Sequence, residues 1–115
     1  NHGAMKLEEL SPLYNRCAAA LVMSLTNLSL LPLELLSCGT IPVVNDGPNN
    51  RLVTDNPNID YVPLSPGALA AELIRIVDAD DQVEASRRAA ASVESLSWAD
   101  SGRRFVADFE EAMHA

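Results

Sequence analysis

The sequence predicts an α/β fold built on part of a doubly wound parallel sheet, with more helices than strands. Three short apolar runs have the length and composition of buried strands: "ALVMSL" at 20–25, "TIPVVN" at 40–45 and "IDYVPL" at 59–64. Helical segments alternate with these runs, as in doubly wound sheets. Such sheets usually carry about six strands, so the three predicted here indicate a single truncated, helix-rich domain over residues 1–115.

The first element predicted is a helix within "KLEELSPLYNRC". Helical spacing places apolar side chains on one face: Leu7, Leu10, Leu13, Tyr14 and Cys17. Pro12 interrupts this segment, so the helix either begins late, with Ser11 as its cap, or is kinked. The strand at 20–25 follows.

A helix from about Leu30 to Cys38 is bounded by sequence signals at both ends. Ser29 is a good N-cap, Pro32 is tolerated in the first turn, and Gly39 provides a C-terminal stop. The strand at 40–45 comes directly after it. This strand–helix–strand unit, with its short crossover, predicts parallel strands and a right-handed connection.

The second half of the chain is predicted to be mostly helical. "DGPNNRLVTDNPN" at 46–58 is rich in turn formers and predicts an irregular loop before the strand at 59–64. Ser65-Pro66 caps a helix with the apolar stripe Leu69, Leu73, Ile76 and Val77. A plainer, alanine-rich helix covers 80–93. Ser97 and Asp100 cap a last helix with the apolar stripe Trp98, Phe105, Val106, Phe109 and Met113. Of these, Trp98, Phe105 and Phe109 are expected in the core.

Composition and charge exclude several classes of protein. The 16 acidic and 8 basic residues give a net charge of −8, which argues against a nucleic-acid partner or an anionic membrane surface. Charged and helix-breaking residues interrupt the apolar stretch 17–44, so no transmembrane segment is predicted. The start of the chain lacks a signal-peptide pattern. Cys17 and Cys38 are expected to be buried free thiols. A cytoplasmic protein is expected.

Polar residues gather where the first predicted strand gives way to the helix. In parallel sheets, ligands bind beyond the carboxyl ends of the strands. In "SLTNLS" at 24–29 the side chains of Thr26, Asn27 and Ser29 suit a sugar or phosphate, and free N–H groups at 29–31 favour an anion. The linker after the second strand should lie beside this segment. It adds Asn45, Gly47 and Asn49.

Glu34 is the one charged residue in the run 24–44. An unpaired buried carboxylate costs several kcal/mol, so Glu34 either reaches water or meets a ligand. Its two oxygens can accept hydrogen bonds from both hydroxyls of a ribose diol. A helix edge at which Glu34 simply touches water is the alternative, and the residues alone leave both open.

Internal catalytic machinery and metal chemistry find no support. The chain has no serine elbow, phosphate loop, GxGxxG or zinc-ligand spacing, so neither a metal nor a cofactor is predicted. His2 and His114 are lone and terminal, and are expected to be exposed. The catalytic residues stay unknown.

The residues "LYNRC", a strand ending in Ser24, and "PLELLSCGTIPVV" resemble the donor-binding, C-terminal half of retaining glycosyltransferases with the GT-B fold, group 1 type. Glu34, Gly39 and Pro42 match that family's second glutamate, its glycine and its proline. Ser97-Trp98 matches its final "SW" helix. Thr26 stands where the family usually has its first glutamate.

Rhamnosyltransferase-like bacterial enzymes of surface-polysaccharide assembly also lack that first glutamate, and they are the branch this chain resembles most. They share a serine as at Ser29, an asparagine as at Asn45, and a segment similar to "NIDYVPLS". The resemblance implies that Glu34 accepts the ribose hydroxyls, that the N–H groups of Ser29 and Leu30 hold the diphosphate, and that Thr26 and Asn27 face the sugar.

The resemblance also implies what surrounds this chain. The donor is a nucleotide diphosphate-sugar, a substrate rather than a cofactor, and the glycan acceptor binds a missing N-terminal domain. The 115-residue chain alone is then expected to be inactive, and bare sheet edges favour a homodimer. Two alternatives remain: a stand-alone, non-catalytic α/β interaction module, and an epimerase, which the missing glycine fingerprint disfavours.

Overall fold

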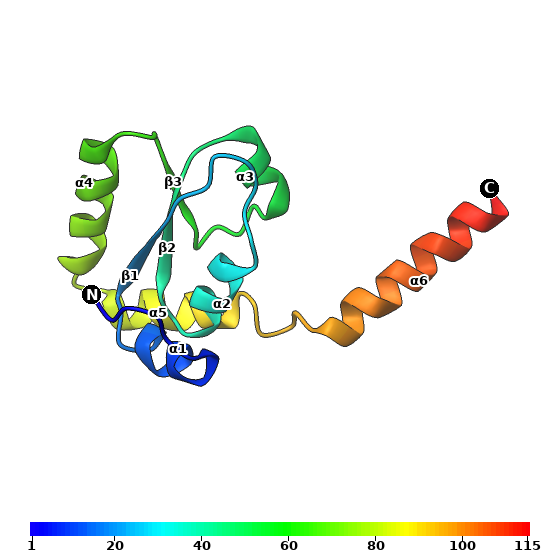
Figure 1. The fold of residues 1–115 in the computed structure, drawn as a ribbon, viewed down its shortest axis with the longest axis horizontal. Helices are drawn as coiled ribbons and strands as arrows, with labels where there is room; N and C mark the ends of the chain where they lie inside the picture. The colour runs from blue at the N-terminus through cyan, green and yellow to red at the C-terminus, as the bar shows by residue number, and fades with distance from the viewer.

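The computed structural model describes residues 1–115 and contains one parallel sheet of three strands (Figure 1). The strands are β1 (Ala19–Val22), β2 (Ile41–Asn45) and β3 (Asp60–Val62), in the order β1-β2-β3. Ala19 is in register with Ile41, and Val43 with Asp60. The predicted α/β class and the parallel strand–helix–strand unit are confirmed.

The central strand β2 is buried along its whole length because helices cover both faces of the sheet. α4 (Pro66–Val77) packs against all three strands, while α2 (Leu31–Ser37) packs against β1, β2 and α5 (Gln82–Ala91). The hydrophobic core lies between these layers. It consists of Val22, Leu28, Leu35, Leu36, Ile41, Val43, Val44, Ile59, Leu69, Ile76, Ala89 and Val93.

Local capping signals locate two helices correctly. The Ser65 hydroxyl accepts a hydrogen bond from Ala68 N at 3.2 Å and begins α4. The Ser97 hydroxyl accepts one from Asp100 N at 3.1 Å and begins α6 (Trp98–His114). Both helices therefore begin where the capping residues predict, because an N-cap needs only a side-chain oxygen and the first turn of its own helix.

Three local features differ from expectation. α1 (Leu7–Tyr14) runs through Pro12, which overturns the late start at Ser11, one of the two alternatives for this helix. β1 ends at Val22, because the chain beyond it turns toward Asn45 and leaves the ladder. Within the predicted irregular loop, α3 (Pro48–Val53) forms a short helix with proline at its first position, where the missing N–H costs nothing.

The turn between α2 and β2 depends on Gly39. Its φ of +76° is in the left-handed region, which glycine adopts without a steric penalty. A Cβ on this residue would lie 2.2 Å from the Ser86 hydroxyl of α5. Gly39 therefore both ends α2 and allows α5 to pack against the turn.

α6 does not join the core. It projects away from the rest of the molecule (Figure 1), none of its residues is buried, and Trp98 is 79% exposed. The radius of gyration is 16.1 Å, whereas a compact chain of this length would have about 13 Å. The expectation that Trp98, Phe105 and Phe109 are core residues is wrong, since a correct amphipathic pattern does not specify what covers it.

The other side-chain expectations are mixed. His2 and His114 are exposed, as expected, and the Arg87-Arg88 and Arg103-Arg104 pairs are exposed as well. Cys17 and Cys38 are free thiols but only half-buried. None of the helices combines the length and apolar character needed to cross a membrane.

Candidate functional site

The segment after β1 is fastened to the end of β2 by the side chain of Asn45. Asn45 is 4% exposed. Ser24 N donates to Asn45 Oδ1 at 2.8 Å, and Asn45 Nδ2 donates back to Ser24 O at 2.7 Å. Asn50 Nδ2 bridges the same region by donating to Ser24 O at 3.2 Å and to Asn45 O at 2.9 Å. These bonds hold the two strand-end linkers side by side, as predicted.

A cleft of about 220 Å³ opens at this edge of the sheet. Its walls come from the two linkers and from Leu64, two residues beyond β3. They are lined by Ser24, Leu25, Thr26, Asn45, Asp46, Gly47, Pro48, Asn49, Asn50 and Leu64. The cleft lies at the carboxyl ends of the parallel strands, which is where ligands bind in open α/β sheets.

The carboxylate in the wall of this cleft is neutralised within the chain. Arg51 Nε donates to Asp46 Oδ1 at 2.5 Å, and the guanidinium lies 4.6 Å from the centre of the Tyr61 ring. The hydrogen bond from Arg51 holds the pKa of Asp46 below its usual value. Asp46 thus presents little unpaired negative charge to an anionic ligand.

The predicted site residues fall into two groups. Thr26, Asn45, Gly47 and Asn49 line the cleft together. Asn27, Ser29, Leu30 and Glu34 do not line it; they are exposed on the chain that leads into α2 and on its first turn. Both polar atoms of the Asn45 amide are hydrogen-bonded to the backbone of Ser24. Asn45 therefore holds the cleft together rather than offering free hydrogen-bonding groups to a ligand.

The start of α2 differs by one residue from the prediction. Leu30, not Ser29, is the N-cap, although the Ser29 hydroxyl accepts a hydrogen bond from Leu31 N at 3.2 Å. Pro32 has no N–H to offer, and Leu33 N donates to Leu30 O. The backbone N–H groups of Ser29 and Leu30 have no acceptor within the chain.

Glu34 is exposed, and its carboxylate makes no hydrogen bond or ion pair. Both oxygens remain available to an external donor of hydrogen bonds.

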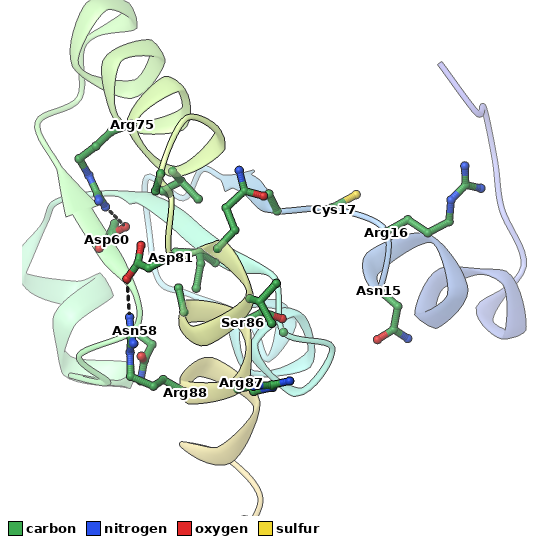
Figure 2. Close-up of a pocket in the computed structure, with 18 of the residues that line it drawn as sticks. Asn15, Arg16, Cys17, Asn58, Asp60, Arg75, Asp81, Ser86, Arg87 and Arg88 are labelled. Atoms are coloured by element: carbon green, nitrogen blue, oxygen red, sulfur yellow. Dashed lines mark hydrogen bonds and ion pairs between the residues drawn. The ribbon is translucent and has the colours of Figure 1, made fainter.

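A larger cavity, of about 630 Å³, lies at the opposite edge of the sheet, before the strands begin (Figure 2). Figure 2 shows Arg75 directed at Asp60 and Arg88 at Asp81, in ion pairs of 3.0 and 3.1 Å. Burial and the neighbouring Glu72 raise the pKa of Asp60. Since its arginines largely pair with carboxylates, and ligands bind at the other edge of such sheets, we place the functional site at the smaller cleft.

Comparison with known families identifies the family of this domain. Residues 1–74 match the family described as WsaF, C-terminal domain. The chain belongs to this family. It is a C-terminal domain of GT-B glycosyltransferases, so the resemblance drawn from Glu34, Gly39 and Pro42 is confirmed. The matched region of this WsaF-type domain includes the cleft, α2 and β1 to β3, whereas α5 and α6 lie outside it.

A relative of the domain is the O-antigen biosynthesis protein RfbC of Myxococcus xanthus, which is 36% identical over 75 residues. The alignment covers 64% of this chain but only 6% of the relative's length. No solved structure matches the chain.

Two features of the cleft were not predicted from the sequence. Asn50 links both linkers, and Arg51 neutralises Asp46. Both residues belong to the segment expected to be irregular. The signal available in the sequence was the Gly47-Pro48 pair, because proline at a first helical position indicates a short helix.

Proposed function

We propose that this WsaF-type domain binds the nucleotide diphosphate-sugar donor of a glycosyltransferase, at the edge of the sheet where β1 and β2 end. The observation that carries the proposal is the exposed, unpartnered carboxylate of Glu34, which follows closely on the free N–H groups of Ser29 and Leu30. A carboxylate suits a ribose diol, and backbone N–H groups suit a diphosphate.

The roles of the individual residues follow from their positions. Glu34 accepts hydrogen bonds from the two ribose hydroxyls. The backbone N–H groups of Ser29 and Leu30 donate hydrogen bonds to the diphosphate. Because α2 has only seven residues, these two N–H groups contribute more than the helix dipole does. Thr26 and Asn27 face the transferred sugar, and Thr26 also lines the cleft.

The transferred group is proposed to be a hexosyl or rhamnosyl unit, passed to a glycan acceptor. This is supported by Thr26 in place of the usual first glutamate, and by a relative named for O-antigen biosynthesis. The acceptor is proposed to bind another domain of the whole enzyme, so we expect no sugar transfer by the 115-residue chain alone.

Calorimetric titration of the chain with UDP, GDP and dTDP tests the donor site through Glu34→Gln. The substitution keeps the shape of the side chain but removes the charge from two hydrogen bonds worth about 1.5 to 3 kcal/mol each. We expect the affinity for the preferred nucleotide to fall at least about tenfold. Thermal unfolding should be unchanged, because Glu34 has no partner within the chain.

Glu94→Gln is the matched control, because Glu94 is also exposed and has no ion pair, but it lies beyond α5 rather than in the first turn of α2. It should leave the affinity unchanged. Equal affinities for the wild type and Glu34→Gln would refute the ribose assignment. Absence of nucleotide binding by the wild-type chain would refute the donor site as a whole and favour the alternative of an interaction module.

A further inference from the structure

Asn50 is a buried residue whose amide has one polar atom without a partner in the chain. It is 3% exposed and belongs to α3, beside the end of the sheet where β2 finishes (Figure 1). Its Nδ2 donates to Ser24 O at 3.2 Å and to Asn45 O at 2.9 Å. Both partners are carbonyl oxygens, so the nitrogen must face them and the amide cannot be flipped. The direction of Asn50 Oδ1 is therefore fixed as well.

The Oδ1 atom of this amide is open to the cleft. It accepts no hydrogen bond within the chain, whereas every fully buried side-chain nitrogen or oxygen has a partner. Asn50 Oδ1 is thus not enclosed, and Asn50 lines the cleft. Polar atoms of residues this deeply buried are usually hydrogen-bonded. An unpaired acceptor on such a side chain points to a hydrogen-bond donor from outside the chain.

The chemistry of Oδ1 restricts the class of group that it can bind. A carbonyl oxygen only accepts hydrogen bonds, so its partner must carry a hydroxyl or an N–H group. A phosphate oxygen is itself an acceptor and would be repelled there. The Thr26 hydroxyl in the same cleft also has no partner within the chain, and no basic side chain lines the cleft. The cleft therefore suits the sugar of the donor rather than its diphosphate.

The size and the walls of the cleft fit a single sugar ring. Pockets for drug-sized ligands measure about 300–1,000 Å³, so a cleft of about 220 Å³ takes a smaller group. Leu25 and Leu64 also line it, both more than half exposed, and their side chains can contact the C–H groups of a pyranose. The hydroxyls at the edge of the ring then meet the polar atoms of Thr26 and Asn50.

We propose that Asn50 is a specificity-determining residue of the donor site, whose Oδ1 accepts a hydrogen bond from one hydroxyl of the transferred sugar. The inference rests on the proposed donor function and extends it to recognition of the sugar. Asn50 discriminates because its acceptor is fixed: a sugar without a hydroxyl at that position leaves Oδ1 unpaired in the closed complex. Thr26 and Asn27 are exposed by comparison, and their side chains can adapt to different sugars.

Calorimetric titration of the wild-type chain with nucleotide-sugars tests this contact without any substitution. The probes are UDP-glucose, GDP-mannose and dTDP-rhamnose, each beside its bare nucleotide, and then monodeoxyfluoro analogues of the tightest binder. Fluorine is similar in size to a hydroxyl but has no proton to donate. We expect the sugar to raise the affinity above that of the nucleotide, and fluorine at one ring position to lower it about threefold to tenfold.

Two substitutions show whether this hydroxyl contacts Asn50. Asn50→Ala removes Oδ1, so the hydroxyl and fluoro forms should then bind within about twofold of each other. Asn45→Leu is the matched control, because it also removes hydrogen bonds that hold Ser24 but leaves Asn50 Oδ1 in the cleft. It should weaken the binding of both forms and keep the preference for the hydroxyl. Circular dichroism shows whether each variant is folded.

Two results would overturn the role of Asn50 and leave the donor site in place. One is a nucleotide-sugar that binds no more tightly than its nucleotide, or whose affinity no fluorine changes. The other is a folded Asn50→Ala chain that keeps the full preference for the hydroxyl, which would assign that preference to another group such as Thr26. A chain that binds none of the nucleotides or nucleotide-sugars would refute the donor site itself, and the role of Asn50 with it.

Discussion

Gly39→Ala is expected to lower the free energy of unfolding by about 2–4 kcal/mol, a large fraction of the 5–15 kcal/mol typical of a domain. Two costs combine. A left-handed φ of +76° costs a residue with a Cβ about 1–2 kcal/mol. The added Cβ would also clash with the Ser86 hydroxyl and lie 3.3 Å from the Ser86 carbonyl oxygen, so the Ser86 side chain must rotate and the turn must move slightly from α5.

Ser86→Ala separates the two costs when urea unfolding is measured for both single variants and the double variant. Ser86→Ala alone should be nearly neutral, because the Ser86 hydroxyl makes no hydrogen bond and alanine is favoured in a helix. In the Gly39→Ala background it removes the closest contact and should recover about 1 kcal/mol. Strict additivity of the two substitutions would show that the contact with Ser86 does not contribute.

Asn45→Leu is expected to lower the free energy of unfolding by about 2–3 kcal/mol and to loosen the cleft. Leucine fills a similar volume but removes both hydrogen bonds to the backbone of Ser24. The Ser24 N–H then loses its acceptor in a half-buried position, which costs about 1–3 kcal/mol, while Ser24 O keeps its bond from Asn50. Donor binding should weaken too, because the linker that carries Thr26 is no longer held.

Thr26→Val is the control for this substitution. Thr26 lines the same cleft, but its hydroxyl has no partner within the chain. We therefore expect a change in unfolding free energy of less than about 0.5 kcal/mol. A loss of stability as large as that of Asn45→Leu would show that the cleft, rather than the two bonds to Ser24, accounts for the effect.

Asn45→Asp adds a dependence on pH. An aspartate here keeps the bond from Ser24 N, but it can donate to Ser24 O only when protonated, so the folded protein raises the pKa of this carboxyl. A raised pKa gives stability that is present below the unfolded value of about 3.9 and is lost as the pH rises through the folded value. The difference in unfolding free energy from the wild type should therefore be larger at pH 7 than at pH 4.5.

The sequence by itself determined the parts of the structure that depend on neighbouring residues. Ser65 and Ser97 cap their helices, and Gly39 ends α2, because these roles need only the backbone of the same turn. The apolar run Ile41–Val44 predicted a strand covered on both faces, and its place after α2 predicted parallel pairing. The family resemblance likewise depended on Glu34, Gly39 and Pro42 at fixed spacing.

Only the tertiary structure decided which side chains find a partner within the chain and which remain without one. In the sequence, nothing distinguishes Asn45 and Asn50 from the other asparagines of the turn regions. Their amides donate hydrogen bonds to Ser24 O because the two linkers meet at one edge of the sheet. Glu34 remains unpartnered because no cation of this chain reaches it. The stripe of α6 has the spacing of a core helix but stays exposed: hydrophobic periodicity specifies which face of a helix is to be buried, while what buries it depends on a surface elsewhere.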